Sequence, residues 1–316
     1  MNIAVEDLSR RRWLGGIGAV ALGGTIPRLR GATVASGCPM GFGTYGLPGF
    51  SLPEAVRFVA ATGFSSVEVV SIPGYHGAPD QVSKTARREV RRLIADTGLQ
   101  LGALMGFPFP DRVKQAQNTE WMKRLFELAQ DLATGAPPLI QSVLGGGKWE
   151  EKKTLFRDCL GPWVDLAGKA GVKLSIKPHR GHAMSRPEDA VWLIEQLHAT
   201  GRLTLVYDYS HYAFRDLPVE KTVEVASPHI GYLVMKDARQ QGGKVRFALP
   251  GETGDIPHAR ILKQFYEGGY RGEVCCEVSS QVWRAKGYDA RQGAKECFTN
   301  LSKVFHEAGV NVRRRG

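Results

Sequence analysis

Short apolar runs alternate with longer amphipathic segments along the chain from about residue 41 onward. The apolar runs are continuous, which is typical of strands in a parallel sheet that is covered on both faces. Eight runs are predicted as strands: 41–45, 66–71, 99–105, 139–143, 174–176, 203–207, 231–235 and 273–278.

The segments between these runs have helical spacing of apolar residues and recognisable helix ends. Ser51-Leu52-Pro53-Glu54 offers a cap residue, an early proline and an acid three positions on, and Gly63 is a stop signal. Other helix ends are also followed by glycine, which adopts the left-handed C-cap conformation at low strain. Helices are predicted over 51–63, 83–98, 118–135, 149–171, 186–201, 217–226, 257–269 and 289–309.

Eight strands and eight helices in alternation predict an α/β protein with a single (β/α)8 barrel, the TIM-barrel fold. The competing fold, a doubly wound sheet, would need a glycine-rich phosphate loop after its first strand, and no such loop is found there. The run Gly145-Gly146-Gly147 lacks the Lys-Ser/Thr of a P-loop. The barrel is predicted to cover residues 38–316 as one domain.

The N-terminal segment has a different character. Arg10-Arg11-Arg12 precedes a Gly/Ala-rich apolar run, 15–26, which is too short to span a membrane. Residues 1–37 are therefore interpreted as a removable twin-arginine signal peptide with its linker, and the alternative is an N-terminal helix of the fold. This predicts a bacterial, exported, periplasmic protein without a membrane span after signal removal. Lipid anchoring at Cys38 is not expected, because Ala35 is a poor start for a lipobox.

Charge and cysteine usage narrow the function classes. The formal net charge is +11, from 42 Lys and Arg against 31 Asp and Glu, but no stripe of basic residues is interleaved with aromatics. A solvated surface is favoured over a nucleic-acid partner, and attraction of anionic substrates is only weakly indicated. The five cysteines form no CxxC pair, which argues against a zinc knuckle or a redox dithiol. They are expected to be reduced and mostly buried.

Candidate chemistry is expected where the barrel strands end, because barrel enzymes place function at the carboxyl ends of their strands. Asp208 and His211, three residues apart, can meet one ligand or each other, and a self-satisfied loop pair is the alternative. Strand alternation would point Glu277 to the same side as Cys275. The polar residues that follow the strands are His76, Lys177, His179, Asp208, His211, Lys236, Asp237, Arg239 and Glu277.

Several motifs in this order carry a resemblance. Lys-Pro-His at 177–179, VYDYSH at 206–211, VMKD at 234–237, GETGDI at 251–256 and GGYRGEVCCEV at 268–278 occur in sequence. With them the chain, from about 41 to 310, resembles the xylose isomerase-like TIM-barrel superfamily of sugar isomerases and epimerases. That superfamily also includes endonuclease IV. The resemblance implies the barrel fold strongly and a single activity only weakly.

The resemblance also implies a metal site from which this chain departs. Members commonly hold a divalent metal with Glu, Asp, His and Glu from strands 5 to 8. By position, Asp208 and Glu277 match two ligands, whereas Lys177 and Val234 occupy the other two positions. His211 corresponds to an accompanying histidine. An ammonium group repels a cation, so no cofactor is expected beyond weak binding of Mn, Mg or Zn by Asp208 and Glu277.

The working hypothesis is an isomerase or epimerase of a sugar or cyclitol that moves a proton next to a carbonyl. Glu277 or Asp208 would be the acid/base, and Lys177 or Lys236 would hold the oxyanion in partial replacement of the metal. His179 and His211 would orient hydroxyl groups. A Schiff base through Lys177 is a less favoured variant.

Further substrate contacts are predicted from Asp237, Arg239 and His76. The rival hypothesis is a non-catalytic, exported sugar-binding barrel that has lost its chemistry together with two metal ligands. Cleavage of abasic DNA would need a histidine-rich multi-zinc site, and the chain has only eight histidines. The expected partner is a small carbohydrate, and a homo-oligomer is compatible with the sequence.

Overall fold

The computed structural model describes residues 36–314 of the chain. The predicted export signal therefore lies outside the described residues except for Ser36 and Gly37. Within the described part, no helix combines the length and the apolar character needed to cross a membrane.

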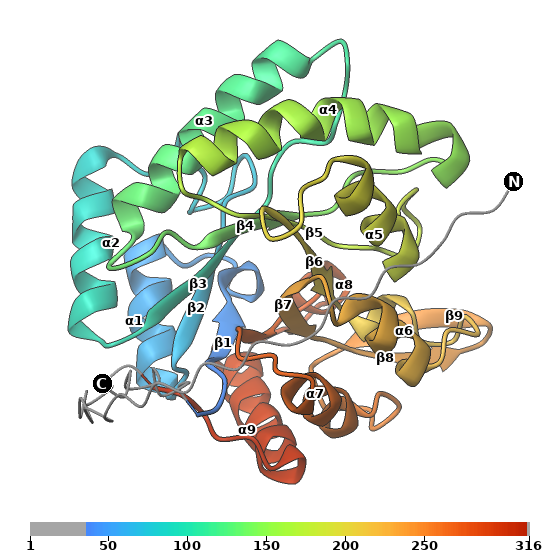
Figure 1. Ribbon diagram of the computed structural model, residues 1–316. Helices are drawn as coiled ribbons and strands as arrows, with labels where there is room; N and C mark the ends of the chain where they lie inside the picture. Colours follow the sequence, from blue (N-terminus) through green and yellow to red (C-terminus); the bar gives the residue numbers. More distant parts are fainter. Residues whose placement is uncertain (1–35, 315–316) are drawn as a thin grey trace, which may run out of the picture. The chain divides into compact units, whose positions relative to one another are not determined.

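Eight parallel strands close into a barrel in which each strand pairs with its neighbours in chain order, and the last pairs with the first (Figure 1). All eight predicted strands are present, with ends that differ by a few residues, so the predicted (β/α)8 barrel is confirmed. The barrel strands are β1 (Met40–Gly43), β2 (Ser66–Val70), β3 (Gln100–Met105), β4 (Leu139–Ser142), β5 (Leu174–Ile176), β6 (Leu203–Tyr207), β7 (Ile230–Met235) and β10 (Val274–Cys276).

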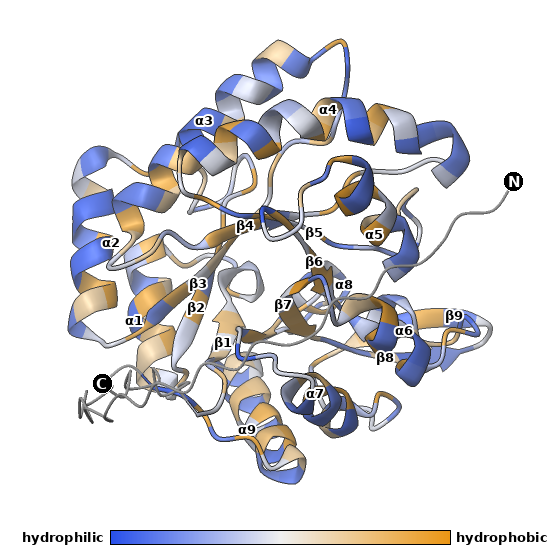
Figure 2. Ribbon diagram, viewed as in Figure 1, coloured by the Kyte–Doolittle hydropathy of each residue, from blue (hydrophilic) through white to orange (hydrophobic). Residues whose placement is uncertain are grey.

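Helices surround the barrel and turn their apolar sides toward it (Figure 2). The first helix begins as its sequence predicts: the backbone N–H of Ser51 donates to Glu54 at 2.9 Å, and Gly63 ends the helix with φ 108°. The outer helices are α1 (Leu52–Thr62), α2 (Lys84–Asp96), α3 (Gln115–Leu132), α4 (Trp149–Lys169), α5 (Pro187–Gln196), α6 (Val219–Ala226), α7 (His258–Glu267) and α9 (Ala290–Ala308).

Five short elements of the described residues were not predicted, and all follow barrel strands. They are the 3-10 turns η1 (Thr44–Gly46) and η2 (Tyr209–His211), the short helix α8 (Ser280–Trp283), and a hairpin of β8 (Asp237–Gln241) and β9 (Lys244–Ala248). The hairpin turns at Gly242 and Gly243, whose positive φ angles of 55° and 71° suit a two-residue hairpin turn. Its polar strands lack the continuous apolar run on which the strand prediction depended.

The interior of the barrel has its own small apolar cluster. Ala103 of β3 and Val206 of β6 both belong to it, although these strands are not neighbours, so the cluster extends across the barrel. Val234 and Cys275 belong to the same cluster, whereas Cys276 belongs to the outer core. Because side chains alternate along a strand, the residues two positions beyond these inward residues also face inward.

The end of the barrel at which the strands begin encloses a buried carboxyl group, that of Glu273, which accepts a hydrogen bond from Ser66. Two glycines leave the room that this carboxyl group occupies: a Cβ on Gly102 would lie 2.5 Å from Cδ of Glu273, and one on Gly41 would also collide with it. Burial raises the pKa of Glu273 to about 8. The carboxyl group is therefore mostly protonated at neutral pH.

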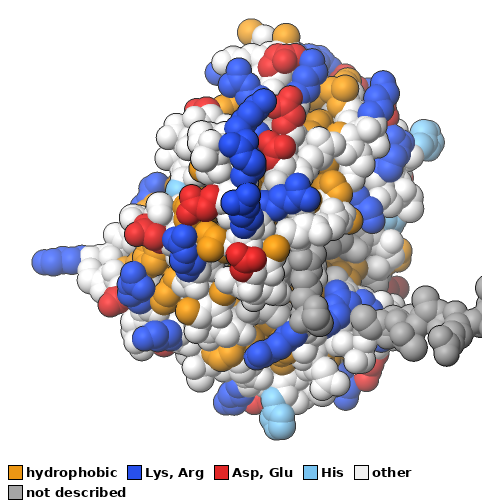
Figure 3. Space-filling model, turned by 90° about the vertical axis from the view of Figure 1, so that its left-hand side faces the viewer, with side chains coloured by type: hydrophobic (Ala, Val, Ile, Leu, Met, Phe, Trp, Pro, Cys, Tyr) orange, Lys and Arg blue, Asp and Glu red, His pale blue; other side chains and the backbone are white. Residues whose placement is uncertain are grey.

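All five cysteines are buried and unpaired, as predicted. Cys38 is fully buried, and its backbone N–H donates to the carbonyl of Asn311 at 3.0 Å. On the face shown in Figure 3, Lys and Arg side chains are interspersed with Asp and Glu. That mixture agrees with a solvated surface rather than a uniform basic field on this face.

Candidate active site

Four charged residues lie directly after four neighbouring strands. Lys177, Asp208, Lys236 and Glu277 are the first residues beyond β5, β6, β7 and β10, which lie side by side in the barrel. Asp208, Lys236 and Glu277 each stand two positions after an interior residue, so alternation directs them inward. The prediction that Glu277 points to the same side as Cys275 is confirmed.

The four side chains form a closed set of ion pairs of alternating sign. Lys177 contacts Glu277 directly, and its Nζ lies 3.7 Å from Oδ2 of Asp208. Nζ of Lys236 lies 2.9 Å from Oδ2 of Asp208 and 2.7 Å from Oε1 of Glu277. All four side chains are at most 7% exposed. Two positive and two negative charges therefore balance in a site almost closed to bulk water, where each pair interacts strongly.

The lysines control the protonation of the two acids. Burial alone would raise the pKa of Glu277, but Lys177 and Lys236 outweigh it and lower the pKa to about 2. Burial opposes ionisation of Asp208 too, and Lys236 nevertheless holds its pKa well below the ordinary range. Burial would lower the pKa of Lys177, yet Glu277 and Asp208 raise it above its ordinary value. All three groups are charged at neutral pH.

Histidines line one side of this charged set. The Lys236 ammonium group, which only donates, lies 2.9 Å from Nε2 of His211, so that nitrogen accepts and His211 is neutral. Burial lowers the pKa of His211 to about 4. The His179 ring packs against it at a tilt of 42°, with 3.8 Å between ring centroids. Nδ1 of His179 donates to the carbonyl of Arg180 at 2.7 Å, which leaves Nε2 of a neutral ring as an acceptor.

A cavity of about 360 Å³ opens onto these charges. From the charged set it is lined by Lys177, Lys236 and Glu277, and from the neighbouring loop by His179. Asp208 is fully buried and does not line it. Glu277 is therefore the carboxylate that a molecule in the cavity would meet. The remaining lining comes from Tyr45, Ile72, Pro73, Met105, Gly106, Phe107, Phe109, Gln141, Ser142, Val143, Phe247, Ser279, Ser280 and Gln281.

The other predicted substrate contacts lie away from this cavity. Asp237 faces the base of the hairpin, where it accepts from the backbone N–H of Ala238 and of Thr253 at 2.9 and 2.8 Å. The Arg239 side chain is 46% exposed and lies 3.9 Å from Glu252. His76 lies 3.0 Å from the Thr44 hydroxyl, beside a separate depression. His211 is fully buried, does not line the cavity, and contacts Lys236 and Asp208 of the charged set.

Sequence reasoning missed another acid near the charged set, Glu68 of β2. Its Oε2 accepts from Gln141 at 2.9 Å, and Gln141 lines the cavity. Burial, followed by repulsion from Glu277, raises the pKa of Glu68 to about 7. A charged residue in the middle of the apolar run SVEVV was the available signal. The aromatic residues of the cavity carried no comparable signal, because apolar side chains after strands are common in ordinary cores.

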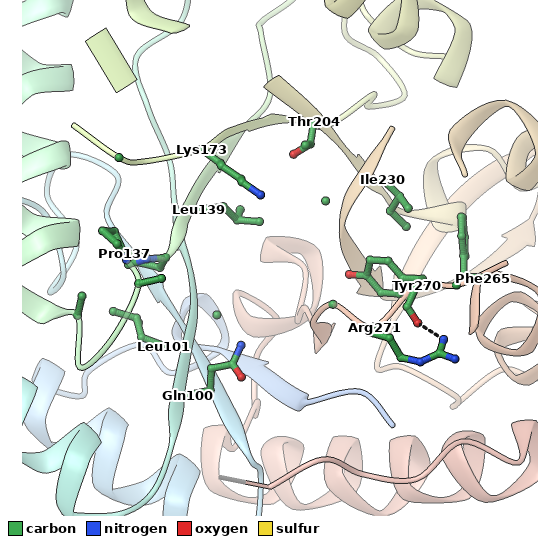
Figure 4. A pocket seen from close by; sticks show the side chains of 18 of the residues that line it. Gln100, Leu101, Pro137, Leu139, Lys173, Thr204, Ile230, Phe265, Tyr270 and Arg271 are labelled. Atoms are coloured by element: carbon green, nitrogen blue, oxygen red, sulfur yellow. Dashed lines mark hydrogen bonds between the residues drawn. The ribbon is translucent and has the colours of Figure 1, made fainter. Parts of the chain in front are cut away.

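A larger cavity, about 710 Å³, opens at the opposite end of the barrel, where the strands begin (Figure 4). Figure 4 shows Lys173 and Thr204 on one side of it and Tyr270 and Arg271 on the other. Its lining contains no carboxylate, and Arg271 donates to the Tyr270 carbonyl at 2.8 Å. Size alone does not make a catalytic site. The smaller cavity is the candidate because charged and acceptor groups converge there.

The donor chemistry of the charged set does not suit a divalent cation. Both oxygens of Glu277 face an ammonium nitrogen, and Oδ1 of Asp208 accepts from the Ser210 hydroxyl at 2.6 Å. Among the described residues, no cluster of three or more Asp, Glu, His or Cys side chains has an arrangement that would hold a metal. A cation would have to displace an ammonium group to reach these oxygens.

The family model of the xylose isomerase-like TIM barrel matches residues 56–302, and the chain belongs to this family. No curated protein sequence matches. Many solved structures share the fold. One of them is a fusion of a xylose isomerase-like TIM barrel with 4-hydroxyphenylpyruvate dioxygenase, which matches with a TM-score of 0.68 and 22% sequence identity. The match covers 86% of this chain but only 43% of the fusion protein.

Other similar structures match over nearly their whole length. The IOLI protein with a bound zinc atom has a TM-score of 0.72 and 16% identity, with 85% of this chain and 99% of that one covered. D-psicose 3-epimerase in the presence of D-fructose has a TM-score of 0.69 and 16% identity, and the match covers 86% of this chain and 99% of that one. The 3-keto-D-glucoside 4-epimerase from E. coli has a TM-score of 0.65 and 15% identity, and the match covers 84% of this chain and 99% of that one. At such identities the likeness shows the fold alone.

Proposed function

We propose that this protein is a sugar isomerase or epimerase that transfers a proton next to a carbonyl group without a bound metal. The observation that carries the proposal is the charged set. Its members Lys177, Lys236 and Glu277 line one cavity from the ends of the strands, and the buried Asp208 forms ion pairs with both lysines. Family membership and the epimerases among the similar structures support the reaction class.

In this proposal the two lysines have the role of an oxyanion clamp. A substrate carbonyl oxygen between the ammonium groups of Lys177 and Lys236 would accept hydrogen bonds from both. Glu277 removes the proton from the adjacent carbon, and the C–H electron pair becomes the C=C bond of an enediolate as the carbonyl π electrons move to oxygen. Return of a proton to the opposite face of that carbon would give the epimer, and return to the former carbonyl carbon, with transfer of the proton of the neighbouring hydroxyl group, would give the isomer. Charge develops where the two ammonium groups already lie, so they stabilise the transition state more than the ground state.

The low pKa of Glu277 in the free protein is compatible with this role. Lys177 and Lys236 lower it, and a substrate oxygen that accepts from both lysines competes with Glu277 for their positive charge. Substrate binding therefore raises the pKa of Glu277 toward the range in which a carboxylate is an effective base. His179 and Gln141, which also line the cavity, would orient hydroxyl groups.

The proposal that Lys177 replaces the family's metal has a direct test. Lys177→Glu places a third carboxylate beside Asp208 and Glu277 and removes one positive charge. Elemental analysis after dialysis against Mn²⁺ should find no stoichiometric metal in the wild-type protein and increased metal in the variant. Stoichiometric metal in the wild-type protein would contradict the proposal.

The proton transfer is tested by solvent exchange. A keto-sugar panel incubated with the protein in D₂O should gain deuterium next to the carbonyl, and EDTA should leave the rate unchanged. Glu277→Gln, which keeps the size of the side chain, should lower the exchange rate at least 100-fold. Glu252→Gln, an exposed acid outside the cavity, is the matched control and should not change it. Exchange that persists in Glu277→Gln would remove Glu277 from the mechanism.

A second candidate function is a non-catalytic sugar-binding barrel. The observation that favours it is the completeness of the ion pairs, which leaves both acids with lowered pKa values in the free protein. Binding of a sugar without any deuterium exchange would support this candidate.

We also propose that residues 1–37 direct export to the periplasm, based on Arg10-Arg11-Arg12 and the apolar run that follows. Fractionation of cells that produce the full chain should find the protein in the periplasm. Changing Arg11 and Arg12 to lysine should retain it in the cytoplasm. Periplasmic recovery of that variant would contradict a twin-arginine route.

A further inference from the structure

The candidate cavity has two chemically different walls. The charged wall comes from the ends of β5, β7 and β10. A second part of the lining comes from the end of β3 and from the segments after β2 and β3, and its side chains carry no charge or strong hydrogen-bonding group: Ile72, Pro73, Met105, Phe107 and Phe109. This second set is called the apolar wall below. Polar side chains of Tyr45, Gln141, Ser142, Ser279, Ser280 and Gln281 also line the cavity.

Phe109 is the most unusual member of the apolar wall, because its side chain is 53% exposed. Of the three large hydrophobic residues that are exposed in the described part of the chain, it alone lines the cavity. Its ring meets His182 edge-on at 6.1 Å between centroids. Exposed apolar surface is unfavourable in water, and where it gathers at the mouth of a pocket it marks a place where a ligand is bound.

A third aromatic group approaches the charged wall from the unpredicted hairpin. Phe247 of β9 lies with its ring 4.9 Å from Nζ of Lys236 and also lines the cavity. The cavity volume of about 360 Å³ corresponds to the share of about twelve water molecules in the liquid, at about 30 Å³ each. This is the lower end of the range for pockets that hold drug-sized ligands.

We infer that the substrate is a keto-glycoside whose aglycone is a single aromatic ring or a similar flat apolar group. The sugar carbonyl lies at Lys177 and Lys236, and the aglycone lies on the apolar wall with Phe109 against its face. This inference rests on the proposed function for the position of the sugar. A free monosaccharide carries a hydroxyl group on nearly every carbon, and a hydroxyl buried against the apolar wall has no side-chain partner there, which costs free energy. An aromatic aglycone gains from the same contact.

The test compares two ligands that differ only in the aglycone, methyl and phenyl 3-keto-β-D-glucoside, by calorimetry on the wild-type protein and two variants. Phe109→Ser removes the exposed ring of the apolar wall. Phe214→Ser, a 42% exposed phenylalanine outside the cavity, is the matched control. Both positions are exposed enough that folding should be retained, which circular dichroism checks.

The phenyl compound should bind the wild-type protein at least tenfold more tightly than the methyl compound. Phe109→Ser should weaken the phenyl compound about tenfold and the methyl compound by less than twofold, and Phe214→Ser should change neither. Equal affinities for the two compounds, an equal loss of both in Phe109→Ser, or no binding of either would overturn the inference. Because the readout is binding, it is separate from the deuterium exchange that tests the proposed function: phenyl preference without exchange would refute only the catalysis.

Discussion

The replacement of Lys177 by methionine is the most informative perturbation of the charged set. Methionine keeps the unbranched shape but leaves Asp208 and Glu277 with Lys236 alone, so the buried set changes from neutral to a net charge of −1. At an effective dielectric constant of 20, the attraction lost between Nζ of Lys177 and Oδ2 of Asp208 at 3.7 Å is about 4 kcal/mol. The desolvation cost of the lysine disappears as well. Removal of one partner from a buried ion pair costs about 3–5 kcal/mol, and we expect a loss in this range.

The assay is urea unfolding of wild type and variant between pH 3 and pH 8. Glu277 has a folded pKa lowered to about 2, so its stabilising contribution is present above its unfolded pKa and is lost as the pH falls through the folded value. Without Lys177 the folded pKa of Glu277 rises. The difference in unfolding free energy between wild type and Lys177→Met should therefore be largest at neutral pH and should shrink as the pH falls below about 5.

A second substitution tests the charge balance itself. Lys177→Met combined with Glu277→Gln leaves one lysine and one acid, so the double variant should recover part of the stability lost in the single one. Lys148→Met, at a side chain 82% exposed in a surface ion pair, is the control and should cost less than about 1 kcal/mol. If Lys177→Met is as stable as the wild type, or if its loss of stability does not depend on pH, the charges do not compensate one another.

Three further outcomes are expected. The raised pKa of Glu273 makes the unfolding free energy of the wild type fall as the pH rises from about 4.5 to about 8. The stability of Glu273→Gln relative to the wild type, measured by urea unfolding, should therefore be more favourable at pH 8 than at pH 4. A difference between the two proteins that does not depend on pH would contradict this. Gly102→Ala should lower the melting temperature by several degrees because its Cβ meets Glu273, whereas Gly146→Ala, which meets nothing within 4 Å, should not; equal melting temperatures would contradict it. In pH–rate profiles, kcat/KM should not fall on the acid side until well below pH 5, because Glu277 stays ionised there; an acid limb near pH 7 would point to Glu68 instead.

The arrangement of elements was predictable because it depends on local patterns. Continuous apolar runs marked the barrel strands, and caps such as Ser51 and Gly63 marked helix ends, since both reflect interactions within a few residues. The inward direction of Glu277 followed from the period of two along a strand. The hairpin of β8 and β9 was not predicted because only alternate residues of β9, Val245 and Phe247, pack against the core, so no continuous apolar run marks that strand.

The barrel and the row of charged strand ends could be predicted from the sequence alone, and so could the presence of Lys177 where the family resemblance implies a metal-binding acid. Which of these residues can meet a ligand could not be predicted from the sequence and depends on the folded arrangement. Glu277 lines the cavity, Asp208 is fully buried, and Asp237 accepts a hydrogen bond from Thr253 outside the cavity. Strand periodicity fixes the side to which a residue points, but which side chains meet depends on how loops far apart in sequence close around the barrel end. The apolar wall also depends on the closed barrel, because the end of β3 and the segments after β2 and β3 share one cavity with the charged strand ends only when the barrel is closed.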